Sequence, residues 1–138
     1  MPNIENNLQI VLLTRSKLEF FDPTQKKVFP FVFPQNLISD LEIINKNELE
    51  TQMTLFVNFY KIRPASMIII LAKDVCFELE IPETDDANMQ NQVNNFLYYL
   101  PFEDSIHKIY KQIKGYSLIA VNHELIETFK FIFSKLGF

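Results

Sequence analysis

Residues 66–72 read SMIIILA, a short and unbroken apolar run with three β-branched residues at its centre. This run is too short to span a bilayer, which needs about 20 apolar residues. It is typical of a strand that is buried on both faces, as in the middle of a sheet covered by helices. We therefore expect Ser66–Ala72 to be a central strand of an α/β fold.

Three β-rich segments precede this run, at Leu8–Leu13, Leu18–Phe21 and Val28–Phe33. The polar turns between them predict an antiparallel meander. Pro30 lies inside the third segment, and because proline cannot donate to the ladder, we expect this strand to be an edge strand or to be bulged. The next segment, Gln35–Asn45, is ambiguous and could hold a short helical turn.

A helix is predicted between the meander and the central strand. Asn47 is the expected N-cap, since Glu50 stands three residues later in the reciprocal capping position. Arg63-Pro64 ends the helix, because the residue before a proline avoids the α region. A helix that crosses between two strands of one sheet usually makes those strands parallel. The apolar face of this helix comprises Leu49, Met53, Phe56, Val57 and Tyr60.

The segment after the central strand, Lys73–Pro82, alternates between apolar and polar residues and predicts a half-exposed strand. Its apolar side carries Val75, Phe77, Leu79 and Ile81. A second helix follows, capped by Asp85 or Asp86 and stopped by Pro101, with Met89, Val93, Phe96, Leu97 and Leu100 on its apolar face.

The C-terminal third is expected to be a hairpin followed by a helix. Phe102–Lys114 suits a helix or a strand, and the apolar run after Gly115 favours strand–Gly–strand. Asn122 caps the last helix. Gly137 stands where a left-handed C-cap is wanted, so that Phe138 can fold back on the last turn.

Composition limits the function classes. The 138 residues indicate a single domain over residues 1–138, and the net charge of −4 without a basic stripe disfavours nucleic-acid binding. The only two glycines, Gly115 and Gly137, are too few for a phosphate-cradling loop, so no cofactor is expected. The chain shows no signal-peptide pattern and no span-length apolar run, which predicts a cytoplasmic location without direct membrane insertion.

No residue pattern predicts catalysis or a metal site. His107 and His123 are interpreted as surface residues, because neither has a cysteine or carboxylate at ligand spacing. Cys76 is expected to be inert, since the neighbouring carboxylates of Asp74 and Glu78 disfavour a thiolate. The pair Tyr98-Tyr99 lies beside a proline break, where core packing is one interpretation and an apolar rim that binds a peptide is another.

Three segments resemble one known family. They are MIIILAKDVCFELEIP, NNFLYYLPFED and YSLIAVNHELIETFKFIFSKLGF, and together with the order of elements they extend the likeness from about Leu8 to Phe138. The chain resembles the N-terminal half of the type IV pilus assembly protein PilM and its relatives in type II secretion. The resemblance implies a mixed α/β sheet, the ribonuclease-H-like half of an actin-like fold. The expected order is three strands, a helix, two strands, a helix, two strands and a helix.

The resemblance also implies a function. PilM-like proteins suggest a non-catalytic scaffold that binds a short peptide tail of an inner-membrane partner in a groove beside the sheet. The strand Val75–Ile81 and the corner Tyr98–Phe102 would then be its walls. The residues expected to contact the peptide are Val75, Phe77, Leu79, Tyr98, Tyr99 and Phe102.

The chain departs from the nucleotide-binding members of this group at the first strand. Val11 and Leu13 stand where those proteins carry the Asp and the Gly of an Asp-x-Gly pattern, which argues against ATP binding and against ribonuclease-H-type two-metal chemistry. The alternative is a nucleotide-binding switch or a small ribonuclease-H-fold enzyme with a degenerate phosphate loop at Thr14, Arg15, Ser16 and Lys17. A third hypothesis is a homodimer formed through an exposed sheet edge.

Overall fold

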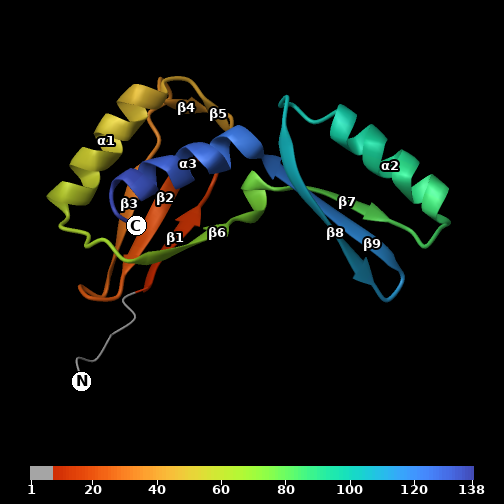
Figure 1. Cartoon of the computed structure of the whole chain (residues 1–138), viewed down its shortest axis with the longest axis horizontal. Coiled ribbons are helices and arrows are strands. Elements are labelled where there is room, and N and C mark those ends of the chain that lie inside the picture. The colour runs from red at the N-terminus through yellow and green to blue at the C-terminus, as the bar shows by residue number, and fades with distance from the viewer. Residues whose placement is uncertain (1–7) are drawn as a thin grey trace. The chain divides into compact units, whose positions relative to one another are not determined.

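The computed structural model describes residues 8–138, which form two compact units (Figure 1). Unit 1 comprises the described residues up to Val75 together with Glu127–Phe138. Unit 2 comprises Cys76–Ile126, so it is inserted in the sequence between the two parts of unit 1. Whether residues 1–138 act as a single domain stays a prediction.

Unit 1 is built on a four-stranded mixed sheet in the order β3-β2-β1-β6. The first three strands, β1 (Leu8–Leu13), β2 (Lys17–Asp22) and β3 (Lys27–Val32), form an antiparallel meander. The fourth strand, β6 (Ser66–Leu71), pairs with β1 in parallel. The predicted meander and the predicted parallel pairing are therefore confirmed.

The place of β6 within the sheet corrects the sequence prediction. Within the described residues β6 pairs only with β1, so it is an edge strand rather than a central one. Ile68 and Ile70 are each 48% exposed, whereas Met67, Ile69 and Leu71 are half-buried. An unbroken apolar run shows only that both faces are apolar, and it does not show that a second strand or helix covers each of them.

The opposite edge of the same sheet fits its sequence. Pro30 lies in β3, directly opposite Glu19 of β2 in an uninterrupted register. The strand is therefore an edge strand without a bulge, as one of the two interpretations of Pro30 predicted. A proline on an edge strand leaves no unpaired donor pointing at a neighbour.

Two structural details between β3 and β6 differ from the prediction. The segment after β3 contains one helical turn, in which the N–H of Ile38 donates to the carbonyl of Pro34 at 3.0 Å, but it also forms an unpredicted small hairpin of β4 (Ile38–Ser39) and β5 (Glu42–Ile43). Helix α1 spans Lys46–Phe59, and its N-cap is Asn45, whose side chain accepts a hydrogen bond from the backbone of Glu48 at 3.1 Å. The predicted cap at Asn47 was wrong by two residues, because Asn45 is the residue with extended backbone just before the helix.

The core of unit 1 lies between one face of this sheet and the helices. Phe20 of β2 contacts Phe56 of α1 and Phe133 of helix α3 (His123–Lys135), with ring centroids 5.4 and 5.7 Å apart. Val11 and Leu13 are fully buried on this face. The two positions that differ from the Asp-x-Gly pattern are therefore core positions in this chain.

The end of α3 confirms the predicted left-handed cap. Gly137 has a φ of +92°, and the backbone N–H of Phe138 donates to the carbonyl of Phe133 at 3.0 Å. The rings of Phe133 and Phe138 pack with centroids 6.1 Å apart. The residue that follows the glycine thus folds back on the last turn of the helix, as in a Schellman motif.

Unit 2 is a three-stranded antiparallel sheet with one helix on it. Strands β7 (Phe77–Ile81), β8 (Ser105–Gln112) and β9 (Gly115–Asn122) have the order β7-β9-β8. Helix α2 spans Asp86–Tyr98 and is capped by Asp85, as expected. The core of this unit comprises Ile81, Val93 and Leu118, with Leu79, Met89, Phe96, Leu97, Ile109 and Tyr116 packed around them.

The predicted strand after β6 is shorter than expected. Lys73–Val75 forms a 3₁₀ turn, in which the N–H of Val75 donates to the carbonyl of Ala72 at 3.1 Å, and only Phe77–Ile81 is a strand. This strand belongs to the sheet of unit 2 and not to the sheet of β6. The alternation of apolar and polar residues over 73–82 correctly predicted a strand at β7. It could not show that β7 belongs to a different sheet from β6.

Candidate functional site

An exposed aromatic corner lies at the C-terminal end of α2, in unit 2. The helix ends at Tyr98, and Tyr99 has the cap conformation, two residues before Pro101. The side chains of Tyr98 and Tyr99 are 82% and 81% exposed, and their rings are nearly perpendicular with centroids 5.2 Å apart. The interpretation of these two tyrosines as core residues is therefore wrong.

A second aromatic pair belongs to the same unit. Phe77 at the start of β7 and Phe102 before β8 make an edge-to-face contact, with centroids 5.4 Å apart, and both are half-buried. Edge-to-face contact is a favoured arrangement of aromatic rings and limits the motion of both side chains. Four of the six residues predicted to contact a peptide thus lie in unit 2 as partly or fully exposed aromatics.

The other two predicted residues, Val75 and Leu79, pack in the interior instead of presenting a surface. Val75 is fully buried in unit 1, so it does not present a surface to a ligand. Leu79 packs against the core of unit 2 beneath α2. The sequence suggested both because they alternate with Phe77, yet alternation does not distinguish a core face from a binding face.

The side of β7 that faces away from α2 is acidic. Glu78 and Glu80 are exposed, and they stand opposite Ile119 and Ser117 of β9. Within the described residues β7 pairs only with β9, so its other edge remains open for pairing. An open strand edge offers a row of backbone donors and acceptors to an added strand.

The polar loop Thr14–Lys17 makes contacts within unit 1. The hydroxyl of Thr14 donates to the carbonyl of Lys17 at 3.1 Å and accepts from the N–H groups of Ser16 and Lys17. The Lys17 ammonium lies 2.7 Å from a carboxylate oxygen of Glu19, and the Arg15 guanidinium lies 3.7 Å from Asp40. These contacts explain the loop as a tight turn with paired charges.

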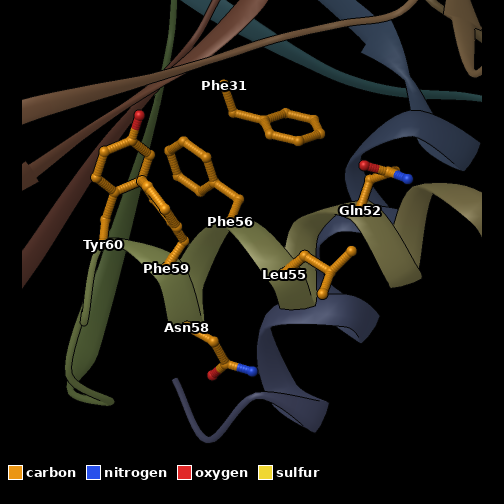
Figure 2. A pocket seen from close by; sticks show the side chains of 7 residues that line it. All are labelled: Phe31, Gln52, Leu55, Phe56, Asn58, Phe59 and Tyr60. Atoms are coloured by element: carbon orange, nitrogen blue, oxygen red, sulfur yellow. The ribbon is translucent and has the colours of Figure 1, made fainter.

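Sequence reasoning missed a hollow on α1. It has a volume of about 610 Å³ and is lined by Phe31, Gln52, Leu55, Phe56, Asn58, Phe59 and Tyr60. Figure 2 shows Phe31 from β3 facing Phe56 from α1, and their ring centroids are 5.3 Å apart. Leu55 and Phe59 are 58% and 76% exposed. Their spacing of one helical turn, outside the buried face, was the signal that could have revealed this hollow.

In residues 8–138 no three His, Cys, Asp or Glu side chains are grouped so that they could hold a metal ion. None of the helices in this part of the chain is both long enough and apolar enough to cross a membrane. His123 Nδ1 lies 2.6 Å from an oxygen of Asp104.

The fold defines a mixed α/β protein in which a small antiparallel unit is inserted after the parallel strand of a four-stranded sheet. No family model matches the sequence, and no curated protein is similar to it. Solved structures share the fold. The chain matches PilM in the PilM–PilN type IV pilus biogenesis complex with a TM-score of 0.56 and 12% identity, over 95% of this chain and 45% of that one.

Two further structures are similar. The cytoplasmic domain of EpsL, an inner-membrane component of the type II secretion system of Vibrio cholerae, matches with a TM-score of 0.51 and 13% identity, over 95% of this chain and 53% of that one. A Bacteroides thetaiotaomicron protein of unknown function with an actin-like ATPase fold has a TM-score of 0.47 and 8% identity, over 96% of this chain and 51% of that one.

The predicted resemblance is confirmed as a likeness of fold. The chain has the mixed α/β fold of part of PilM and of the EpsL cytoplasmic domain, and it spans about half the length of these structures. At 12% and 13% identity the likeness extends to the fold and not to the residues of a site.

Proposed function

We propose that this chain is a non-catalytic interaction domain of a type IV pilus or type II secretion assembly. In this proposal it works in the cytoplasm and binds a short peptide tail of an inner-membrane partner. The observation that carries the proposal is the pair of tyrosines at the end of α2, which are more than four-fifths exposed and belong to the same unit as the unpaired edge of β7. The likeness to PilM, solved in complex with PilN, supports the choice of a protein partner.

The chemistry of β7 indicates what kind of peptide would fit. An extended peptide that pairs with the open edge of β7 would lie beside the exposed Glu78 and Glu80. Cytoplasmic segments next to a membrane span carry an excess of Lys and Arg. A tail in which basic residues alternate with apolar ones would therefore pair its charges with the two glutamates.

The aromatic residues would supply the apolar anchoring. Tyrosine is enriched at protein interfaces because its ring buries a large apolar area while its hydroxyl keeps a hydrogen bond. Tyr98 and Tyr99 are exposed for this role, and Phe77 and Phe102 offer a preformed aromatic pair at the start of β7. Interface residues of this kind dominate binding energies.

Peptide binding tests this proposal. Overlapping 15-residue peptides would cover the cytoplasmic tails of single-span inner-membrane proteins from the same organism, with fluorescence anisotropy as the readout. We expect Tyr98→Ala combined with Tyr99→Ala to weaken the binding of the best peptide by about tenfold or more. Glu78→Lys combined with Glu80→Lys should weaken a basic peptide and strengthen its Lys→Glu analogue.

The hollow on α1 supplies the matched control. Leu55→Ala and Phe59→Ala also remove exposed apolar side chains, but in unit 1. We expect these two variants to bind the peptide as well as the unsubstituted protein does. Peptide binding that depends on Leu55 and Phe59 and not on the tyrosines would refute the site in unit 2.

The alternative function is a nucleotide switch or a small ribonuclease-H-fold enzyme that uses Thr14, Arg15, Ser16 and Lys17. A phosphate bound there would compete with Asp40 for Arg15 and with Glu19 for Lys17. The two basic side chains lack the glycine-rich backbone that usually surrounds a phosphate. The interaction-domain proposal is therefore preferred.

A further inference from the structure

The turn of the β8–β9 hairpin carries an apolar residue that the fold does not use. Strand β8 ends at Gln112 and β9 begins at Gly115, so the loop consists of the two residues between them, Ile113 and Lys114. Gly115 supplies the positive φ of this hairpin, and turn positions otherwise favour small polar residues and proline. Ile113 is nevertheless 100% exposed, so its side chain contributes no burial to unit 2.

This turn extends beyond the end of β7 in the same sheet. Strand β7 ends at Ile81, which is paired with Tyr116, and the chain then leaves the sheet for α2. Ile113 and Lys114 lie beyond that pair, at an end of unit 2 that α2 does not cover (Figure 1). A hairpin turn is convex, so it fits a soft or hollow surface better than a flat one.

Positive charge surrounds the exposed isoleucine. Residues 105–116 contain three lysines and no Asp or Glu, whereas the whole chain has a net charge of −4. Lys111 and Lys114 are both exposed, one on each side of Ile113 in the sequence. In the described part of the chain, neither they nor Lys108 form an ion pair with a carboxylate. Their charges are therefore available to an anion outside the chain.

We propose that this turn binds the surface of an anionic phospholipid membrane. Ile113 enters the boundary between headgroups and acyl chains, and Lys111 and Lys114 bind the lipid phosphates. Charge complementarity favours this partner, because an anionic membrane attracts lysines near its surface and its acyl boundary accepts an apolar side chain without a preformed cavity. The contact is peripheral and crosses no bilayer, and it revises the expectation of no direct membrane insertion at this one turn.

Distances along β8 decide which side chains take part. At about 3.3 Å per residue, Lys111 lies about 7 Å from Ile113, Tyr110 about 10 Å and Lys108 about 17 Å. With Ile113 about 5 Å below the phosphates, Lys111 lies close to their plane and Lys108 about 12 Å above it, beyond the Debye length of about 8 Å. Tyr110, which is 44% exposed, then lies at the level of the headgroups, where tyrosine is enriched.

Acidic residues on the β7 side of the turn oppose this binding. A Cβ atom on Gly115 would lie 3.0 Å from the backbone nitrogen of Glu83, whose side chain is exposed. Glu80 is farther from the turn, level with Tyr110 in the register, because both are paired with Ser117. We therefore expect Glu83→Gln to strengthen membrane binding by about twofold to fivefold.

Cosedimentation with lipid vesicles tests the proposal. We expect binding to vesicles of equimolar phosphatidylglycerol and phosphatidylethanolamine, no binding to phosphatidylcholine vesicles, and a loss of binding as salt is added. Ile113→Asn should weaken the binding by about tenfold, and Lys111→Gln and Lys114→Gln by about fivefold each. Lys108→Gln is the matched control, since it removes the same charge from the same strand but should leave the binding unchanged. Circular dichroism checks that every variant is folded.

Tryptophan fluorescence tests the insertion itself. The chain contains no tryptophan, so Ile113→Trp places a single reporter at the turn. Its emission should shift to the blue on the anionic vesicles and be quenched by brominated acyl chains. Lys108→Trp is the control, and its emission should be neither shifted nor quenched.

The outcomes separate this proposal from the peptide site. The vesicles carry no protein, so the variant with Tyr98→Ala and Tyr99→Ala should bind them as well as the unsubstituted protein does. A folded protein that does not bind the anionic vesicles overturns the proposal, and so does binding that Lys108→Gln weakens as much as Lys111→Gln does. Binding that Ile113→Asn leaves unchanged and that polyglutamate competes away also overturns it, and assigns the turn to an acidic protein.

Discussion

Asp22 is an acidic residue of unit 1 whose pKa is shifted by its surroundings. It is fully buried at the end of β2, and burial raises its pKa. Hydrogen bonds outweigh this effect, since Gln25 Nε2 donates to the carboxylate at 2.7 Å and the N–H of Thr24 donates at 2.9 Å. Gln9 Nε2 adds a longer contact of 3.4 Å. The net result is a pKa below the ordinary value, so the carboxylate stays ionised inside the protein.

Asp22 should make the stability of the protein depend on acid. Its pKa in the folded state lies below that in the unfolded chain, which is about 3.9. The ionised group therefore stabilises the fold above that pH, and the contribution is lost as the pH falls through the lowered folded-state value. We expect Asp22→Asn to reduce the free energy of unfolding at pH 7 by about 1–3 kcal/mol.

Urea denaturation at a series of pH values between 3 and 7 measures this effect. The Asp22→Asn variant should show a smaller loss of stability between pH 5 and pH 3 than the unsubstituted protein. The exposed Glu83→Gln is the control for removing a carboxylate. Equal acid sensitivity of the Asp22→Asn variant and the unsubstituted protein would contradict the assignment.

At the scale of elements, the β8–β9 hairpin depends on a glycine. Gly115 begins β9 with a φ of +103°, a conformation that other residues rarely adopt. A Cβ atom placed there would lie 2.2 Å from the carbonyl oxygen of Ile81 and 3.0 Å from the backbone nitrogen of Glu83. The close approach joins the hairpin to the turn that precedes α2, so both the conformation and the space require glycine.

A comparison of the two glycines separates these requirements. Gly137 also has a positive φ, but a Cβ there would lie 3.2 Å from the side chain of Pro64 rather than against backbone. We expect Gly137→Ala to destabilise the protein by about 1 kcal/mol and Gly115→Ala by about 3 kcal/mol or more. Denaturant unfolding measures both, and equal losses would show that crowding at Gly115 contributes nothing.

The elements that the sequence predicted well are those defined by local chemistry. The turns of the meander, the cap at Asp85 and the ending at Gly137 each depend on residues close in sequence, and all three were confirmed. The exposure of β6 and the assignment of β7 to another sheet depend on which segments meet in space. Local periodicity does not contain that information, so these two predictions failed in part.

The candidate site shows the same limit. Tyr98, Tyr99 and Phe102 were predicted from their aromatic character beside a proline break, and Phe77 from the strand that the family resemblance implied as a groove wall. The structure brings all four into one unit. The hollow on α1 was missed because Leu55 and Phe59 point away from the face that was counted as core. From the sequence alone, an apolar residue on the surface looks the same as an apolar residue in the core. The two can be distinguished only when the structure shows which residues are buried.

At the scale of the whole molecule, the fold alone leaves nucleotide binding open, because unrelated activities share one fold. Val11 and Leu13 are core residues, and the basic residues of the loop after β1 are paired with carboxylates. We expect calorimetric titration with ATP and magnesium to give no heat of binding for the folded protein. Micromolar binding that Arg15→Ala and Lys17→Ala abolish would favour the nucleotide switch over the interaction domain.

The order of the two units along the chain has a consequence for synthesis on the ribosome. Phe20 leaves the ribosome before unit 2 does, and its partner Phe133 follows only after all of unit 2 has been made. The ribosome adds roughly 5–20 residues per second, so helix α3 is synthesised on the order of ten seconds after β2. The aromatic core of unit 1 is incomplete during that time. During this interval the nascent meander is the segment on which chaperones would act.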